Sequence, residues 1–350
     1  MNRFKDGGGD ERKLTGIREV ARIAGVSVGT VSNVLNRPDV VAEATRQRVH
    51  AVIEQLEFVP NRGAADLRSG RSRMIGLVVP DITNPFFAEV ARGAVNAANE
   101  DNIAVVLCNS DHAASQEDRY LDVLEQHRVA GVLINPLGKV PSRLESLRDR
   151  GLKVVCVDRS VRKSAYCSVS VDDVRGGEIA VEHLLAPGAR RLVLVNGPAS
   201  LRPCADRRRG AWRALDKAGL SRDSLTEVVC RSMTIRAGVE AGARMLQLPE
   251  LPDAVFCTND LLAIGVMRAL VNAGVGVPGD VAIVGYDDID LAADAAVPLT
   301  SVSQPKFALG RKAMQLLLAE IAEGSSHEHE RIAFQPDLTV RDSSAAPKAG

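Results

Sequence analysis

TGIREVARIAGVSVGTVSNVLN, residues 15–36, predicts two short helices that are joined by a tight glycine turn. Gly25 suits the left-handed residue that ends a helix, and Ser27 is a natural N-cap for the helix that follows. The expected helices are residues 17–24 and 28–35. Together they form a helix-turn-helix, the smallest unit that places a helix in the major groove of DNA.

A third helix is predicted over residues 42–56, because apolar residues recur there at the spacing of one helix face. Its apolar stripe is Val49, Val52, Ile53 and Leu56. The first two helices contribute six apolar residues to the same core: Val20, Ala21, Ile23, Val31, Val34 and Leu35. The three helices form an all-α headpiece over residues 14–60, and a generic three-helix bundle is the alternative.

Beyond residue 73, short runs rich in Val and Ile alternate with helical stretches. The runs are MIGLVVP, IAVVLC, AGVLIN, KVVCV, RLVLVN, TEVVC, AVFC and VAIVG. Continuous apolar strands separated by helices predict parallel sheets that are covered on both faces. Two such sheets form two doubly wound lobes around a cleft. Ligands of such sheets bind beyond the carboxyl ends of the strands.

The formal net charge is zero, but the charge is unevenly distributed along the chain. Residues 1–73 hold 13 Lys and Arg against 9 Asp and Glu, and the remainder holds 31 against 35. A basic N-terminal region suits contact with DNA phosphates, while the acidic remainder of the chain is repelled by them. The distribution therefore favours a DNA-binding front joined to a body with another task.

Other features exclude several classes of protein. The six cysteines form no C-x-x-C pair and the six histidines show no metal spacing, so we expect no metal site, no disulfide framework and a reducing cytoplasm. His327 and His329 are expected in a solvated loop. Residues 1–13 predict a disordered tail and not a signal peptide. No apolar run approaches the length of a membrane span, so no membrane partner is expected.

Two enzyme motifs lack their structural context. Residues 25–29 spell G-x-S-x-G, which needs a strand before it, yet here the motif joins two predicted helices. Residues 274–279 spell G-x-G-x-x-G, but Pro278 interrupts the motif and a strand follows it. We therefore expect neither an enzyme nor a cofactor.

Three segments, in order and spacing, resemble the LacI/GalR family of bacterial transcription regulators: REVARIAGVSVGTVSNVLN, TRQRVHAVIEQLEFVPN and GLVVPDITNPFF. The resemblance covers about residues 15–342. It implies a helix-turn-helix headpiece and an α/β periplasmic-binding-protein-like body of two doubly wound parallel-sheet lobes. It also implies a homodimeric repressor of sugar genes that binds a palindromic operator and is released by a small sugar.

The resemblance places residues 28–35 in the major groove. The positions implied to read base edges are Val28, Gly29 and Asn33, and those implied to contact phosphates are Ser27, Thr30 and Ser32. Position 29 is Gly where the family usually has Ala or a polar residue, and position 33 is Asn where Arg is commonest. Since Asn pairs with adenine whereas Arg favours guanine, we expect an unusual base opposite Asn33.

The linker, residues 61–73, is similar to the family's hinge helix, which folds on DNA as a dimer. DNA contacts are implied at Asn61, Ala64 and Leu67, and Leu67 takes the place of a leucine that enters the minor groove. Gly63 lowers helix propensity by about 1 kcal/mol relative to Ala. A plain flexible linker is therefore the alternative.

The body is similar to sugar-binding proteins of the ribose-binding type. Carried over by position, the effector residues are Asn84, Phe86, Phe87, Asp158, Arg159, Arg208, Met233, Asn259, Asp287 and Gln304. Arg207 is the alternative to Arg208, because the run DRRRGAW leaves the register open by one residue. Asn259 and Asp287 also suit helix N-caps. Polar groups beside two phenylalanines suit a small pyranose such as ribose.

The resemblance also implies the domain boundaries. One lobe is expected over residues 74–170 and 306–333, and the other over 171–302 and 334–341, followed by a tail over 343–350. Two alternatives stay open for the function: an effector that is a phosphorylated metabolite or purine corepressor, and a sugar-binding transport component, which would need an export signal and no DNA-binding front.

Overall fold

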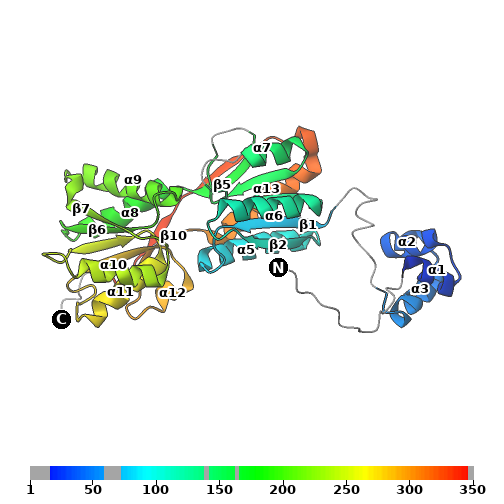
Figure 1. Cartoon of the computed structure of the whole chain (residues 1–350), viewed down its shortest axis with the longest axis horizontal. Helices are drawn as coiled ribbons and strands as arrows, with labels where there is room; N and C mark the ends of the chain where they lie inside the picture. Colours follow the sequence, from blue (N-terminus) through cyan, green and yellow to red (C-terminus); the bar gives the residue numbers. More distant parts are fainter. Residues whose placement is uncertain (1–15, 59–71, 138–141, 162–164, 346–350) are drawn as a thin grey trace, which may run out of the picture. The chain divides into compact units, whose positions relative to one another are not determined.

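The computed structural model describes residues 16–58, 72–137, 142–161 and 165–345, and the chain divides into two compact units between Arg71 and Ser72 (Figure 1). The first unit is the helical headpiece and the second is the α/β body. The predicted tail, residues 1–13, lies outside the described residues, as do three implied DNA contacts: Asn61, Ala64 and Leu67.

The headpiece contains the predicted helix-turn-helix. Helix α1 is Ile17–Ala24, α2 is Val28–Asn36 and α3 is Glu43–Gln55, with the short 3-10 helix η1, Pro38–Val40, before α3. Gly25 ends α1 with a φ of 65°, the left-handed conformation that glycine adopts without strain. The Ser27 hydroxyl accepts a hydrogen bond of 3.0 Å from the Thr30 amide and so caps α2. Both predicted caps are confirmed.

The headpiece core is formed by apolar side chains from all three helices and by Phe58, which follows α3. The helical members are Val20, Ala21, Ala24, Val31, Val34, Val49 and Val52. The prediction for Ile23 is wrong, since its side chain is 39% exposed. The buried side of α1 carries Val20, Ala21 and Ala24. At about 100° per residue, Ile23 lies outside that stripe.

The body's first lobe is built on sheet A, whose strands lie in the order β11-β5-β4-β3-β1-β2 and are all parallel. Their bounds are β1 Met74–Val79, β2 Ala104–Asn109, β3 Gly131–Ile134, β4 Lys153–Val157, β5 Cys167–Val171 and β11 Arg331–Phe334.

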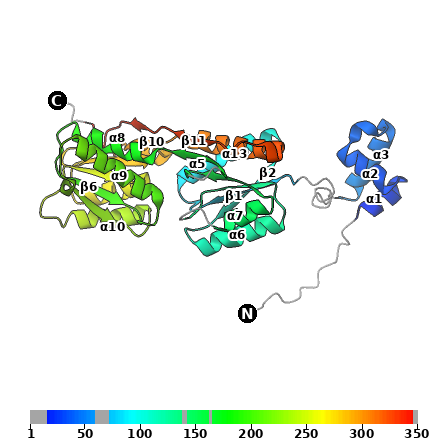
Figure 2. The ribbon, with the colours of Figure 1, turned by 90° about the horizontal axis from the view of Figure 1, so that it is seen from above.

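Alternate side chains of sheet A enter two separate cores. Leu77 and Leu133 contact the core under α5, Pro85–Glu100, and α13, Lys306–Glu323. Val78 and Val132 contact the core under α6 and α7, whose bounds are Ala114–Gln126 and Ser142–Asp149. Figure 2 shows the two pairs of helices on opposite sides of the sheet. This two-sided burial explains why the strands are continuously apolar in the sequence.

The second lobe repeats the arrangement on sheet B, whose order is β12-β10-β9-β8-β6-β7. Its strands are β6 Leu192–Asn196, β7 Leu225–Val229, β8 Ala254–Cys257, β9 Ala282–Asp287, β10 Thr300–Ser303 and β12 Asp337–Thr339, the last antiparallel to β10. One face is covered by α8, Asp173–Leu185, and α9, Arg202–Lys217. The other is covered by α10, Ile235–Met245, and α11, Asp260–Asn272. Short helices are α12 Asp290–Ala293, η2 Arg222–Ser224 and η3 Gly324–Ser326.

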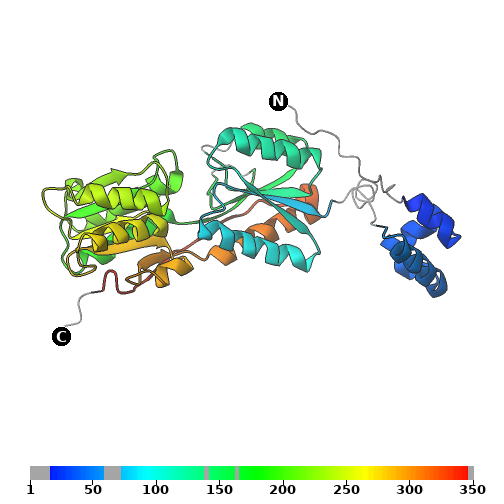
Figure 3. The ribbon, with the colours of Figure 1, turned by 60° about the horizontal axis from the view of Figure 1, so that its bottom comes forward.

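The chain passes between the two sheets in three places: from β5 into α8, from β10 into α13, and from β11 into β12 (Figure 3). Each connection is short. Three short connections between two separately packed lobes are typical of a hinge that lets a cleft open and close.

The helix pairs on the sheets cross where glycines meet. A Cβ on Gly310 of α13 would overlap the Val90 carbonyl oxygen of α5, and a Cβ on Gly93 would overlap the Phe307 carbonyl oxygen. In the second lobe, a Cβ on Gly177 of α8 would overlap a backbone carbonyl oxygen of α9, and a Cβ on Gly210 of α9 would overlap one of α8. The absence of side chains at these crossings lets the backbones approach closely.

The prediction of a tail from residue 343 is wrong for its first residues. Ser343 is fully buried, and its hydroxyl accepts from the Thr300 amide at 2.8 Å and donates to the Ile283 carbonyl at 2.7 Å. Ser344 is also buried and its hydroxyl bonds His183 and the Thr300 hydroxyl, both at 2.7 Å. These serines satisfy polar groups of the second lobe, which is a tertiary role that a polar sequence does not reveal.

The loop before β11 also differs in part from its prediction. His329 is exposed, but the side chain of His327 is only 4% exposed and its Nδ1 lies 2.7 Å from Oε2 of Glu323. His327 therefore does not belong to a solvated loop, because α13 and β5 cover it.

The six cysteines are free and buried. None of the helices in the described part of the chain has both the length and the hydropathy that a membrane span requires.

Candidate functional site

Helix α2 of the headpiece has one buried and one open side. Val31 and Val34 lie in the core, whereas Val28, Gly29 and Asn33 are exposed. The three implied phosphate contacts lie near this open side, with Ser27 exposed and both Thr30 and Ser32 half-buried. An exposed Val28, 38% accessible, has no role in the core and suits contact with a thymine methyl group.

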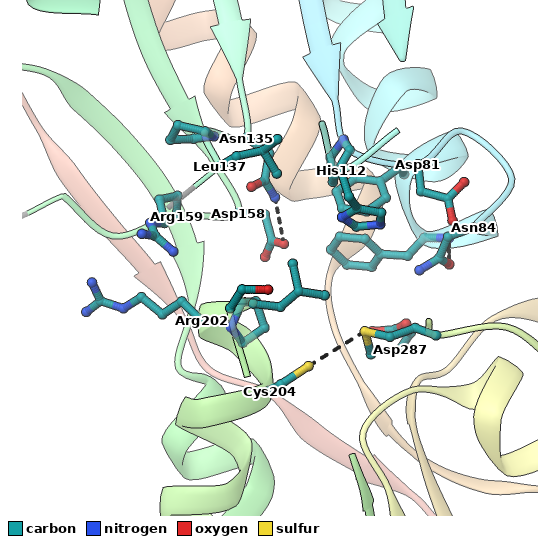
Figure 4. A pocket seen from close by; sticks show the side chains of 18 of the residues that line it. Asp81, Asn84, His112, Asn135, Leu137, Asp158, Arg159, Arg202, Cys204 and Asp287 are labelled. Atoms are coloured by element: carbon teal, nitrogen blue, oxygen red, sulfur yellow. Dashed lines mark hydrogen bonds between the residues drawn. The ribbon is translucent and has the colours of Figure 1, made fainter. Parts of the chain in front are cut away.

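The body contains a cavity whose walls come from both lobes (Figure 4). Its polar residues follow the carboxyl ends of strands: Asp81 after β1, Asn135 after β3, Asp158 after β4, and Asp287 at the end of β9. The amino ends of α5 and α9 complete the wall. This is the position in which open α/β sheets bind ligands.

Seven of the predicted effector residues line this cavity: Asn84, Phe86, Phe87, Asp158, Arg159, Met233 and Asp287. Residues from β4 and α5 in one lobe thus face residues from β9 in the other. Three predicted residues do not line it: Arg208, Asn259 and Gln304.

Asp158 is a buried carboxylate with incomplete hydrogen bonding. Its side chain accepts a hydrogen bond of 3.2 Å from Asn135, while its Oδ1 is buried without a partner. Burial, followed by the nearby charge of Asp173, raises the pKa of Asp158 well above its usual range. The backbone has a φ of 52°, a strained conformation that tertiary packing must maintain. Asp158 is therefore positioned to accept a hydrogen bond from a ligand.

Asp287 faces the cavity from the other lobe. It has a φ of 104° and is 3% exposed, and burial raises its pKa to about 6. Its Oδ1 accepts a hydrogen bond of 2.7 Å from Gln304 and lies 3.8 Å from Nη1 of Arg207. The two carboxylates, Asp158 and Asp287, give the cavity acceptors on both sides.

The structure resolves the choice between Arg207 and Arg208, because Arg207 lines the cavity and Arg208 does not. Arg207 is 4% exposed, with its Nε bonded to Asp173 at 2.8 Å and its Nη1 bonded to the Thr258 carbonyl at 2.6 Å. Its guanidinium lies 3.6 Å from the centre of the Tyr286 ring. These contacts hold its charge rigidly at the wall.

The structure does not place Arg208, the residue carried over by position, in the cavity wall. One residue along α9 rotates a side chain by about 100°, which takes it out of the cavity. Arg208 instead pairs with Glu227 of β7 at 3.1 Å and lies over the Trp212 ring at 4.8 Å. The sequence left this choice open, and only the helix register resolves it.

Asn259 and Gln304, which are also predicted to bind the effector, do not line the cavity in this structure. Asn259 is fully buried; it accepts from the Leu262 amide at 2.9 Å to cap α11 and donates to the Met233 carbonyl at 3.0 Å. Gln304 is 3% exposed and donates to Asp287, while its Oε1 is buried without a partner. Both residues support cavity residues from behind.

Aromatic and sulfur-containing side chains form the apolar part of the wall. The rings of Phe86 and Phe87 are 5.0 Å apart and nearly perpendicular. The Asn84 side chain accepts from the Phe86 amide at 3.0 Å and so caps α5, as well as lining the cavity. Met233 lies against Cys204 at 3.7 Å.

Sequence reasoning missed several polar and apolar lining residues, which include His112, Asn135, Leu137 and Arg202. Asn135 follows β3 directly, so inspection of the residue after that apolar run would have found it. His112 has a φ of 54° in the turn after β2, and Arg202 begins α9. No sequence signal marks the side chains of these two residues as facing the cavity.

Comparisons with known proteins agree with this arrangement. A family model for bacterial regulatory proteins, lacI family, matches residues 16–61. A second model, for periplasmic binding proteins and the sugar binding domain of the LacI family, matches residues 72–337.

Similar proteins cover almost the whole chain. The ribose operon repressor of Escherichia coli strain K12 is 34% identical, over 93% of this chain and 99% of its own. The transcriptional repressor PurR of Photobacterium profundum is 31% identical, over 93% and 98%. Among solved structures, a lac repressor dimer bound to operator and an anti-inducer superposes with a TM-score of 0.84 at 26% identity, over 95% of this chain and 100% of that one.

Proposed function

The chain belongs to the LacI family of bacterial regulatory proteins and is a DNA-binding transcriptional regulator, and we propose that a small neutral sugar releases it from a palindromic operator. Its site of action is then the cytoplasm, where operator DNA lies. The exposed face of α2 would enter the major groove, and the cavity of the body would hold the sugar.

The proposal of a neutral sugar rests on the carboxylates of the cavity. Asp158 presents an oxygen without a hydrogen-bond partner, and Asp287 faces it from the other lobe. A sugar hydroxyl donates to such an oxygen, whereas an ionised phosphate offers only acceptor oxygens and cannot donate to it. The charge of Arg207 is already matched by Asp173, so this arginine adds no net attraction for an anion. Phe86 and Phe87 offer an apolar surface to a sugar ring.

Closure of the cavity would couple sugar binding in the body to operator binding by the headpiece. A sugar that bonds both lobes stabilises a closed arrangement, and the three connections between the sheets allow that change. Coupling between two such sites is typically about 1–3 kcal/mol.

One edge of the first lobe has the exposed apolar side chains that suit a dimer contact. Strand β2 lies at the end of sheet A, and exposed apolar side chains gather there and on the adjacent α5: Val95, Val106 and Leu107. We propose this edge as part of the contact between two copies, which is supported by the dimer seen for the similar lac repressor.

A purine corepressor is the second candidate, because PurR proteins are similar to this chain at about the same identity as the ribose repressor. A thermal-shift screen of pentoses, hexoses, disaccharides, sugar phosphates and purines separates the two. A ligand at about 100 times its dissociation constant adds about 2.7 kcal/mol to the free energy of unfolding. A shift with a free sugar supports the proposal, and a shift with purines or phosphates alone contradicts it.

Asp158→Asn is expected to weaken binding of the sugar found in that screen by about 10- to 100-fold, because an amide NH2 group, which only donates, replaces one of the two carboxyl oxygens that can accept from a sugar hydroxyl. The melting midpoint without sugar should not fall, since burial already disfavours the Asp158 charge. Isothermal titration calorimetry measures the affinity. Asp111→Asn is the control, because Asp111 has a similar φ of 50° but is exposed. Unchanged sugar affinity in Asp158→Asn would remove this residue from the site.

Asn33→Arg is expected to change the preferred base of each operator half-site from adenine to guanine. A good pair between a side chain and a base contributes about 1–3 kcal/mol of discrimination, or roughly 5- to 150-fold in affinity. Selection of bound sequences from a randomised pool measures the preference. Gln55→Arg adds the same charge at an exposed position at the end of α3 and should leave the preference unchanged. An Asn33→Arg protein with the original preference would show that position 33 does not read a base.

A further inference from the structure

Four potential metal ligands meet in the first lobe, away from the sugar cavity. They are Cys167 at the start of β5, Glu320 in the last turn of α13, and His327 and His329 in the loop that leads into β11. Their ligand atoms all lie within 4.8 Å of one another. Since Cys167 is at the amino end of its strand, the cluster lies at the opposite end of sheet A from the cavity.

The distances in the cluster suit a tetrahedral site. Sγ of Cys167 lies 3.2 Å from Nε2 of His327 and 3.8 Å from Nδ1 of His329. Bond lengths of about 2.0–2.3 Å to zinc put neighbouring ligands of a tetrahedron about 3.3–3.8 Å apart. Cys167 and both histidines therefore bind one ion after shifts of a few tenths of an ångström.

Glu320 provides a second, independent observation that points to a cation ligand at this cluster. The residue is only 4% exposed, and its Oε2 is buried without a hydrogen-bond partner. A buried carboxylate oxygen of this kind is costly, and a bound cation would remove that cost. Burial raises the pKa of Glu320, and the charges of Lys153 and His327 oppose that shift, but neither residue supplies a hydrogen bond to Oε2.

The surroundings of the cluster orient its ligands. Nδ1 of His327 bonds Oε2 of Glu323 at 2.7 Å, which leaves Nε2 directed at Cys167. Histidines that bind metals commonly donate their second nitrogen to a carboxylate in this way. The Glu330 amide donates to Sγ of Cys167 at 3.3 Å, which stabilises a thiolate.

We propose that Cys167, Glu320, His327 and His329 form a binding site for a divalent transition-metal ion of the zinc class. Sulfur, imidazole and carboxylate ligands together suit zinc better than magnesium or calcium. On binding, Cys167 releases its thiol proton to solvent. The exposed His329 gives the ion a path of entry. The bound ion joins α13 to β5 and to the strand that leads toward the second lobe.

A catalytic or redox role for the same cysteine does not fit. Cys167 is fully buried, and burial raises the pKa of its thiol. Reactive cysteines instead have a lowered pKa and access to solvent.

The test uses the full-length protein, free of any histidine tag and stripped with a chelator. Zinc is titrated in competition with a chromophoric chelator, and Co²⁺ is used as a spectroscopic probe. We expect one zinc per chain, a rise of about 5 °C in the melting midpoint at zinc 100-fold above its dissociation constant, and the visible bands of a tetrahedral cobalt–thiolate complex. Absence of stoichiometric binding, or the spectrum of an octahedral site without sulfur, would overturn the proposal.

Variants that keep the metal-free melting midpoint test whether each residue binds the ion, separately from any effect on folding. Glu320→Gln removes a buried charge, so its metal-free midpoint should equal or exceed that of the wild type, while zinc affinity falls at least tenfold. His329→Gln alters an exposed side chain and should have the same effect on affinity. Glu323→Gln should lower affinity about 10- to 100-fold through the orientation of His327. Cys230→Ser, at a buried cysteine of the other lobe, should bind zinc normally. Normal zinc binding by Glu320→Gln and His329→Gln would place the ion elsewhere.

Discussion

Arg207→Ala is expected to lower the free energy of unfolding of the body by about 3–5 kcal/mol and to weaken effector binding at least tenfold. Arg207 is buried between Asp173 and Asp287 and lies over the Tyr286 ring. Its removal leaves two carboxylates in a low-dielectric wall without their cation, which is the costly way to break a buried ion pair.

Arg208→Ala is the matched control, because it removes the same side chain one position along α9. Arg208 pairs with Glu227 at the surface of the lobe, and both side chains are about a quarter or more exposed. Such a pair contributes about 0–1 kcal/mol. Differential scanning calorimetry of the full chain separates the body's transition from that of the headpiece, and calorimetric titration gives effector affinity. Equal effects of the two variants would contradict the assignment of Arg207 as the residue of the cavity wall.

Gly310→Ala is expected to lower the free energy of unfolding of the body by about 3 kcal/mol, although alanine favours a helix by about 1 kcal/mol over glycine. A Cβ at this position would overlap the Val90 carbonyl oxygen, which belongs to the backbone of α5 and cannot rotate away. The two helices would have to separate and open the core that contains Leu309 and Val90.

Gly279→Ala is the control for the Gly310 prediction. A Cβ on Gly279 would meet no atom within 4 Å, and its φ lies outside the left-handed region. We expect a change within about 0.5 kcal/mol. Chemical denaturation followed by circular dichroism gives both values. A Gly310→Ala protein as stable as the wild type would show that α5 and α13 can separate at little cost.

The local features of this chain were determined by the sequence itself. Gly25 and Ser27 define the turn of the headpiece because a left-handed residue and a side-chain cap act within a few residues of the backbone they stabilise. The strand runs of the body predicted parallel sheets because burial on two faces requires apolar residues at every position. The same pattern predicts that residues at strand ends, such as Asp158 and Asp287, lie near one another, and both line the cavity.

Only the tertiary structure decided which polar residues face the cavity and which support it. Arg207 and Arg208 are adjacent and chemically identical, and the rotation of α9 alone separates a buried ion pair from a surface one. Asn259 lies in the interior as a cap, and Ser343 belongs to the core of the second lobe instead of a tail.

The cluster of Cys167, Glu320, His327 and His329 shows the same limit most clearly. More than 150 residues separate Cys167 from each of its three neighbours along the chain, so no local spacing could reveal it. Sequence patterns record interactions between residues a few positions apart, because backbone geometry fixes those distances. Contacts between distant segments depend on how whole helices and sheets pack, and that packing decided where these side chains meet.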